Sequence, residues 1–344
     1  MILVTCVLRG RSLAFKKANN YSLGNQTMRK CKTGSFASRI LLLLVSVLAA
    51  CDKDLPSNVD AKISHDGSRI AVIRHKSSGT EMTVIDVDSP QIHSSRVVVP
   101  ALTRSANFGN SKDDVLITYG ERHKDTPYTM HLAGLSLKDP RHTVTEYASS
   151  DVYLAFPEQL DDGSILVMSG LYRTKDGYIP EKIWWLVRPG EQVRIVGDPW
   201  LGLGGPPRIV GAGFYEVEPV YRPPDAGPKL HGWALPSGAV PDVSRFLTKD
   251  TNDLSCTRNG SFCLRSQFFI SSNGEYHGKL TALANGKECP VPGLPPRIDR
   301  VNVAANVPVA VVVVADDAYR PRTVNVLQFA SNSCQLTRNI RVED

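Results

Sequence analysis

A polar turn followed by a run of β-forming residues recurs along the chain, and this repeat limits the fold more than any other feature. Clear copies are SHDGSRIAVI at 64–73, SKDDVLITYG at 111–120 and LDDGSILVMS at 160–169, and weaker copies lie at 211–221, 257–266 and 304–314. Successive turns lie 47, 49, 50, 47 and 46 residues apart when anchored at Gly67, Asp114, Gly163, Gly213, Gly260 and Asn306. Such constant spacing indicates a repeat architecture in which each copy is one structural unit.

Each unit is long enough for four short strands. In the first unit we expect strands at 60–64, 69–75, 81–87 and 96–99. Four strands in every roughly 40–50 residues are typical of a β-propeller blade. The sequence therefore predicts an all-β fold, a single β-propeller domain of about six four-stranded blades over residues 58–344. A pair of β-sandwiches is the alternative, but it would not require a constant spacing.

The first and third units carry a family resemblance. Ser64-His65-Asp66-Gly67-Ser68 precedes the second expected strand, and Val84-Ile85-Asp86 lies in the third. These features resemble the repeats of TolB-type and related WD-like propellers, most strongly over residues 58–90 and 150–170. The chain order gives complete blades, innermost strand first. We therefore expect the ring to close by packing of blade six on blade one, without exchange of a strand.

The N-terminal segment has the features of an export signal. Residues 40–50 read ILLLLVSVLAA, too short a run to span a bilayer but suited to the apolar region of a signal peptide. Four basic residues precede it: Arg29, Lys30, Lys32 and Arg39. A signal peptide of ordinary length would begin at Met28 and cover 28–50, so we interpret 1–27 as an over-called start.

Leu48-Ala49-Ala50-Cys51 resembles the lipobox of bacterial lipoproteins. The resemblance implies cleavage before Cys51, acylation of Cys51 with fatty acids such as palmitate, and durable anchoring in a membrane that faces the periplasm. Residues 51–57 would be the tether. An ordinary cleaved signal with a chance cysteine is the alternative. Asp52 resembles an inner-membrane retention signal, but the choice between inner and outer membrane stays open.

The charge of the chain divides at the end of the signal. Residues 1–50 hold eight basic residues and no acidic ones. The whole chain has 40 basic and 34 acidic residues, which leaves 32 against 34, a net of −2, in 51–344. Sequence-independent nucleic-acid binding needs many cations, so we expect no nucleic-acid partner.

Four cysteines remain after the signal and the anchor: Cys256, Cys263, Cys289 and Cys334. An even number in an oxidising compartment favours disulfides, with three possible connectivities. Asn259-Gly260 is a hairpin turn signal between the first two, which favours Cys256–Cys263 and leaves Cys289–Cys334. Free thiols or a metal site are the alternatives, although the spacing matches no zinc motif.

Three aspartates share a position in their repeats. Asp60, Asp253 and Asp299 each lie seven residues before a turn anchor, which places them at the start of the innermost strands of neighbouring blades one, five and six. Carboxylates at the mouth of a central channel can hold Ca²⁺ or act as acid and base. The alternative is that they simply face water. We expect no other cofactor.

A second recurring feature is arginine at the end of the second strand, often preceded by tyrosine. The residues are Arg74, Arg122, Tyr172, Arg173, Tyr221, Arg222, Tyr319 and Arg320. The loops after these strands emerge on one face of a propeller. Arginine and tyrosine are enriched in interface hot spots, and guanidinium groups match carboxylates and phosphates. We expect a monomer whose surface binds an acidic envelope protein or an anionic polymer. Capping of exposed strand ends is the alternative.

Two functions follow from these patterns. The chain contains none of the G-x-S-x-G, H-E-x-x-H, P-loop or C-x-x-C motifs. The first hypothesis is a non-enzymatic, membrane-anchored binding or scaffold propeller. The second is a periplasmic hydrolase or lactonase-like enzyme that uses the channel carboxylates and a divalent cation.

Overall fold

The computed structural model describes residues 58–76, 79–88, 93–121, 129–170, 172–174, 177–179, 182–188, 191–198, 206–218, 228–236, 238–270, 276–295, 297–315, 321–331 and 333–342. The signal, Cys51, Asp52 and the tether lie outside these ranges. No helix within them is long and apolar enough to cross a membrane.

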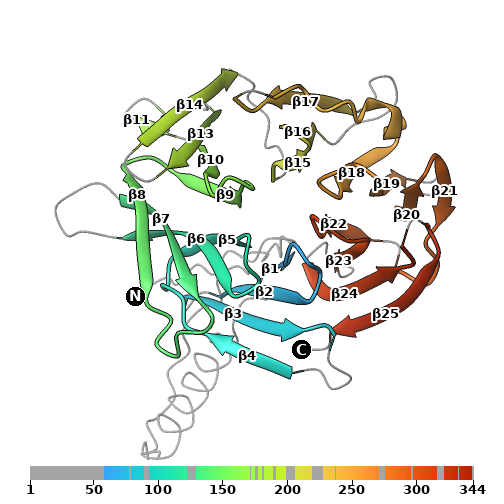
Figure 1. The fold of residues 1–344 in the computed structure, drawn as a ribbon, viewed down its shortest axis with the longest axis horizontal. Helices are drawn as coiled ribbons and strands as arrows, with labels where there is room; N and C mark the ends of the chain where they lie inside the picture. The colour runs from blue at the N-terminus through green and yellow to red at the C-terminus, as the bar shows by residue number, and fades with distance from the viewer. Residues whose placement is uncertain are drawn as a thin grey trace, which may run out of the picture. The chain divides into compact units, whose positions relative to one another are not determined.

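Six antiparallel blades make up this part of the chain (Figure 1), as the repeat predicts. Blades one to three contain β1 Asn58–Ile63, β2 Arg69–Lys76, β3 Gly79–Asp86, β4 His93–Val97, β5 Thr103–Phe108, β6 Asp114–Glu121, β7 Thr129–Ser136, β8 Val144–Ser150, β9 Leu154–Gln159, β10 Ile165–Ser169, β13 Lys182–Arg188 and β14 Glu191–Asp198. Blades four to six contain β15 Arg208–Val210, β16 Gly213–Glu218, β17 Lys229–Ala234, β18 Thr251–Cys256, β19 Phe262–Ile270, β20 Tyr276–Ala284, β21 Lys287–Pro290, β22 Ile298–Val303, β23 Val309–Ala315, β24 Pro321–Phe329 and β25 Leu336–Val342.

Strands pair in chain order within each blade. Five blades have four strands, and blade four has three among the described residues. Blade three also carries a small hairpin, β11 Tyr172–Thr174 with β12 Gly177–Ile179, which the repeat did not predict. A short 3-10 helix, η1 Ser244–Phe246, lies in the connection from blade four to blade five.

The core lies between neighbouring blades, and this explains the composition of the second strands. In β2, Ile70, Ala71, Val72 and Ile73 are all buried, although successive side chains point to opposite faces of the sheet. Both faces of a central strand are therefore covered by neighbouring blades, and for this reason the sequence of such a strand is a continuous run of apolar residues. Outermost strands such as β8 keep most of their side chains at least partly exposed.

The ring closes by packing of blade six against blade one, as expected. Val59, Ala61 and Ile63 of β1 share a buried cluster with Val311 and Val313 of β23. The amide of Asn306 also donates a 2.9 Å hydrogen bond to the carbonyl of His65 across this seam. In the described chain, β1 pairs with β2 and the last sheet contains only β22 to β25, so no strand is exchanged.

Both predicted disulfides are present. Cys256 and Cys263 lie directly opposite each other on β18 and β19, and their sulfurs are bonded. The second bond joins Cys289 on β21 of blade five to Cys334, which precedes β25 of blade six. One bond therefore fixes a hairpin, and the other connects the last two blades.

Candidate functional site

The innermost strands place one polar side chain from each blade along the central channel. We call this set the channel ring: Lys62, Asn107, Glu158, Arg208, Ser255 and Asn302. Together with His65 and Arg258 it lines a cavity of about 40 Å³. Because side chains of a strand alternate between its two sides, the residues two positions earlier on each strand, such as Asp60 and Asp253, form a second layer.

Arg208 ties blade four to blades five and six. Its side chain is 8% exposed, and Nη2 donates to Asp253 Oδ2 at 3.1 Å. Nη1 donates to Asn302 Oδ1 at 3.0 Å, and the backbone carbonyl of Val301 accepts a further bond. The amide of Val301 donates to the same Asp253 oxygen at 3.2 Å. This guanidinium is therefore committed to bonds between blades.

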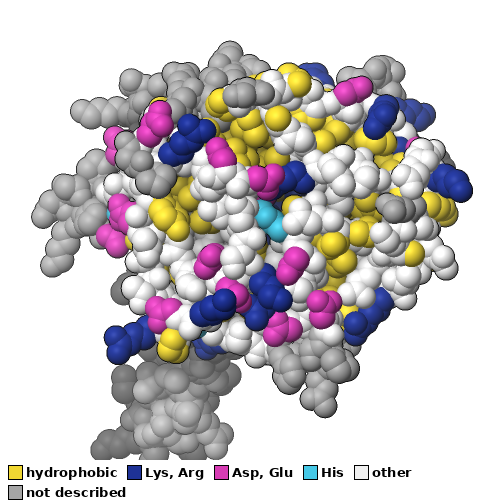
Figure 2. Space-filling model, viewed as in Figure 1, with side chains coloured by type: hydrophobic (Ala, Val, Ile, Leu, Met, Phe, Trp, Pro, Cys, Tyr) yellow, Lys and Arg dark blue, Asp and Glu magenta, His cyan; other side chains and the backbone are white. Residues whose placement is uncertain are grey.

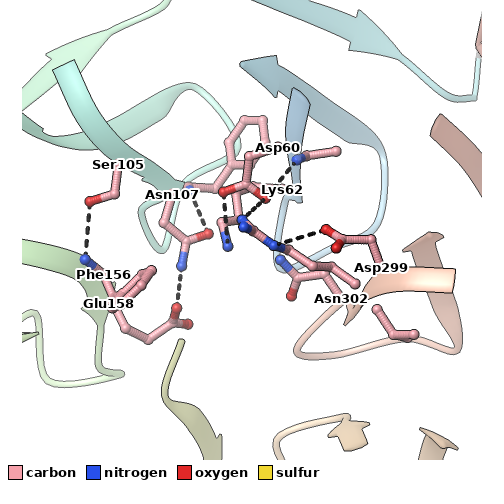
Figure 3. A network of polar contacts seen from close by, with 12 residues as sticks. Asp60, Lys62, Ser105, Asn107, Phe156, Glu158, Asp299 and Asn302 are labelled. Carbon is pink, nitrogen blue, oxygen red and sulfur yellow. Dashed lines mark hydrogen bonds and ion pairs between the residues drawn. The ribbon is translucent and has the colours of Figure 1, made fainter. Parts of the chain in front are cut away.

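Asp60 lies between two cations (Figure 3). Its Oδ1 is 3.2 Å from Arg300 Nη1, and its Oδ2 is 3.7 Å from Lys62 Nζ. Burial by itself would raise the pKa of the Asp60 carboxyl, but the charges of Lys62 and Arg300 outweigh it and hold the pKa below its usual value. Burial lowers the pKa of Lys62, and Arg208 and Arg300 add to that effect while Asp60 opposes it.

Asp299 differs from Asp60 and Asp253 because its cationic partner, Arg300, belongs to the same blade. It lies where β22 loses register between Ile298 and Arg300, and Arg300 extends from this point toward Asp60. Asp299 Oδ2 is 3.3 Å from Arg300 Nε. Burial raises the pKa of Asp299, and the charges of Asp60 and Asp253 raise it further against the opposing charge of Arg300.

The predicted aspartates thus lie on innermost strands, but each contacts a cationic side chain. The described residues hold no group of three or more His, Cys, Asp or Glu side chains that could bind a metal ion. The Ca²⁺ hypothesis therefore gains no geometric support in this part of the chain.

Residues of blades one, two, three and five also line the cavity. Asn107 Nδ2 donates to Glu158 Oε2, and His65 Nε2 is 3.7 Å from Glu158 Oε1. Arg258, in the β18–β19 turn, donates to the carboxylate of Asp161 and to the carbonyl of Gln159, the latter at 2.9 Å. Arg258 therefore links blade five to blade three beside the cavity. Lys, Arg, Asp, Glu and His side chains gather around the centre of the face shown in Figure 2.

The arginine and tyrosine surface is only partly described. Arg74 lies near the end of β2 and is half-buried. Tyr172 and Arg173 lie on β11, opposite Ile179 and Tyr178, but their side chains are outside the description. The remaining positions lie outside the described residues: Arg122, Tyr221, Arg222, Tyr319 and Arg320. The binding surface stays a prediction.

The sequence analysis predicted no member of the channel ring, although the sequence contains a signal for it. Four members lie five residues before the turn anchor of their repeat: Lys62, Glu158, Arg208 and Ser255. Two of the predicted aspartates, Asp60 and Asp253, lie two positions before Lys62 and Ser255 on the same strands. Applying the anchor spacing to every inward position would have revealed these residues, since side chains two apart on a strand share a side.

No protein-family model matches the chain, and no curated protein matches it in sequence. Solved structures with a similar fold include the acylaminoacyl peptidase of Pyrococcus horikoshii, at 13% identity and a TM-score of 0.49 over 83% of this chain and 45% of that one. An oligogalacturonate lyase from Vibrio parahaemolyticus has 10% identity and a TM-score of 0.45 over 76% of this chain and 79% of the lyase. TolB from Acinetobacter baumannii has 14% identity and a TM-score of 0.43 over 70% of this chain and 55% of TolB. The chain spans less than half of the peptidase, and these likenesses concern the fold alone.

Proposed function

We propose that the protein is a non-enzymatic binding or scaffold propeller, anchored in a membrane through Cys51 and facing the periplasm. The observation that carries the proposal is the use of the channel carboxylates in contacts between blades. Asp253 is bonded to Arg208 of blade four, and Asp60 to Arg300 of blade six. Carboxylates that pair with cations of neighbouring blades hold the blades together, which suits a rigid platform better than proton transfer.

The anchor determines where such a platform would act. The lipobox at Leu48-Ala49-Ala50-Cys51 and the seven-residue tether 51–57 would hold the propeller close to the membrane surface. Replacing Cys51 with serine should abolish palmitate labelling and leave the precursor uncleaved. Equal labelling of both chains would contradict the anchor. A chain that starts at Met28 should be exported as well as the longer one.

The proposed partner is acidic, either an envelope protein or an anionic polymer, and binds the arginine and tyrosine surface defined by the sequence. Capture of the full-length, tethered protein with its partner from cross-linked envelopes tests this proposal. Screening weakens attraction between exposed charges, so the yield should fall as the salt concentration rises. A yield that does not depend on salt would contradict an acidic partner.

The alternative is a periplasmic hydrolase or lactonase-like enzyme. Asp299 favours it, because a carboxyl group whose pKa is raised by burial and by the charges of Asp60 and Asp253 can act as a general acid. Thermal unfolding with Ca²⁺ and with EDTA separates the two functions. A Ca²⁺-dependent rise in melting temperature that disappears in the Asp60/Asp253/Asp299→Ala variant would favour the enzyme. No such rise is expected for a binding platform.

A further inference from the structure

A second cavity lies against blade five and shares no lining residue with the cavity at the channel ring. Its lining comes from three segments: η1, the turn between β18 and β19, and the hairpin of β20 and β21. Its volume of about 340 Å³ lies within the range of sites that hold small molecules. Blade five therefore offers a space that neither the channel nor the arginine and tyrosine surface uses.

A buried arginine holds two walls of this cavity together. Arg265 of β19 has a side chain that is only 3% exposed. Its Nη1 donates to the carbonyl of Phe246 in η1 at 2.8 Å, and its Nη2 donates to Glu288 Oε2 on β21 at 2.7 Å. Hydrogen bonding to Arg265 holds the pKa of Glu288 below its usual value. The carboxylate of Glu288, which is the only one in the described lining, is therefore matched by a buried cation.

Two cations of the lining, Arg245 and Lys287, have no carboxylate within 4 Å in the described part of the chain. The carboxylate closest to Arg245 in sequence, that of Asp242, accepts a hydrogen bond from the hydroxyl of Ser244 instead. The lining thus carries two unmatched positive charges. In the channel ring, by contrast, both cations face a carboxylate. The electrostatic environment of the blade-five cavity therefore favours an anionic group.

Local structure sets the positions of these two cations. The guanidinium of Arg245 lies over the ring of Phe246, 4.7 Å from its centroid, and its N–H groups make no hydrogen bond within the described part of the chain. Lys287 follows the two-residue turn Asn285-Gly286, in which both residues have positive φ, and it pairs with Ala284 across the hairpin. Both cations therefore extend from short, well-defined turns of the backbone.

Apolar side chains continue the lining beside the cations. Leu283 and Ala284 of β20 are buried, and the ring of Phe246 is half-buried. A carboxylate offers one oxygen to each cation, and its geometry matches a guanidinium group. A phosphate has a third oxygen, but the hydroxyl of Ser261 in the lining already donates to Asn259 Oδ1 at 2.7 Å. The lining is thus suited to a carboxylate with an apolar neighbour.

We propose that the cavity of blade five binds a carboxylate carried on an apolar group, with the carboxylate between Arg245 and Lys287 and the apolar group against Phe246 and Leu283. The ligand is a free aromatic or aliphatic acid, or the C-terminal residue of a polypeptide that ends in an apolar side chain. This site is independent of the arginine and tyrosine surface, so it stands whether or not the proposed envelope partner exists.

Isothermal titration calorimetry with phenylacetate on the full-length protein tests the site in the wild-type chain. Phenylacetate should bind, and its neutral isostere phenylacetamide should bind about tenfold more weakly or worse, since it lacks the charge that the two cations recognise. Acetate should also bind more weakly than phenylacetate, because it has no ring to place against Phe246. Equal affinities for phenylacetate and either analogue, or tighter binding of phenyl phosphate, would overturn the proposal.

A matched pair of double variants tests the two cations. Arg245→Met combined with Lys287→Met should reduce the affinity for phenylacetate about tenfold or more. Arg96→Met combined with Lys249→Met removes one exposed arginine and one exposed lysine outside the lining and should leave the affinity unchanged. All four side chains are exposed, so the circular dichroism of both variants should match that of the wild type. Unchanged affinity in the first variant, or equal losses in both, would show that these cations do not form the site.

Two peptides separate the possible sources of the ligand. A pentapeptide that ends in leucine with a free carboxylate should bind more tightly than N-acetyl-leucine if the site takes the end of a polypeptide, and more weakly if it takes a free acid. The same pentapeptide with a C-terminal amide should bind about tenfold more weakly than its acid form in either case. Equal binding of the acid and amide forms would contradict recognition of a carboxylate.

Discussion

Replacing Arg208 with methionine should destabilise the propeller strongly. Methionine fills similar apolar volume, but the ion pair with Asp253 at 3.1 Å and the hydrogen bond to Asn302 at 3.0 Å are lost. The substitution leaves Asp253 without its cation in a largely buried position. Breaking a buried pair by removing one partner costs about 3–5 kcal/mol, a large share of the roughly 5–15 kcal/mol that stabilises a typical protein.

The control for this substitution is an exposed arginine. Arg96 pairs with Glu81 at 3.2 Å, but its side chain is 75% exposed, so Arg96→Met should cost about 1 kcal/mol or less. Urea unfolding of the two variants and the wild type measures both effects, and an unchanged slope would show that only stability differs. Adding Asp253→Asn to the Arg208→Met variant should recover part of the loss. Equal losses for Arg208→Met and Arg96→Met would refute the role of Arg208 as a tie between blades.

Three further predictions concern the seam, the disulfides and pH. Gly67 and Gly163 both have positive φ, 75° and 83°, but a Cβ at Gly67 would lie 2.7 Å from Val307 Cγ2, whereas a Cβ at Gly163 would meet nothing within 4 Å. Gly67→Ala should therefore lower the melting temperature more than Gly163→Ala. Equal effects would argue against the close packing of blades one and six. Replacing Cys289 and Cys334, whose bond joins residues 45 apart, should lower the free energy of unfolding by about 4 kcal/mol. Replacing Cys256 and Cys263, which are 7 residues apart, should lower it by about 2 kcal/mol. Urea unfolding measures both losses, and a larger loss for the Cys256–Cys263 bond would contradict this order. Because the pKa of Asp299 is raised in the folded state, its contribution to stability is present below the ordinary aspartate pKa and is lost as the pH rises through the raised pKa. Over this pH range the free energy of unfolding of the wild type should fall, and that of Asp299→Asn should fall less. An equal slope in the two proteins would contradict the raised pKa.

The blade order and the hairpin disulfide could be predicted because they depend on local patterns, and the closure and the Cys289–Cys334 bond followed from those two predictions. The turn at Gly67 and the apolar run in β2 lie within ten residues of each other, and Asn259-Gly260 sets the hairpin that brings Cys256 opposite Cys263. Because each of these features lies within a short segment, the constant spacing of the repeats is enough to identify it wherever the repeat is clear.

The candidate site could be predicted only in part, because its contacts join distant segments. Arg208 meets Asp253 and Asn302 across 45 and 94 residues, and no local pattern specifies that meeting. The register shift in β22 is equally hidden, and it brings Arg300 rather than Asp299 against Asp60. The anchor spacing marks Arg208 as an inward position but does not show which residues it contacts.

The central claim is that the arginine and tyrosine surface, and not the channel, binds an acidic partner. Capture from envelopes with the Arg122/Arg173/Arg222→Glu variant tests it most directly. Its control is Arg96/Arg141/Arg341→Glu, which reverses three exposed charges elsewhere and changes the net charge equally. Weakened capture by the first variant alone, with circular dichroism unchanged in both, is the expected result. Undiminished capture by the first variant, or equal loss in both, would contradict the claim.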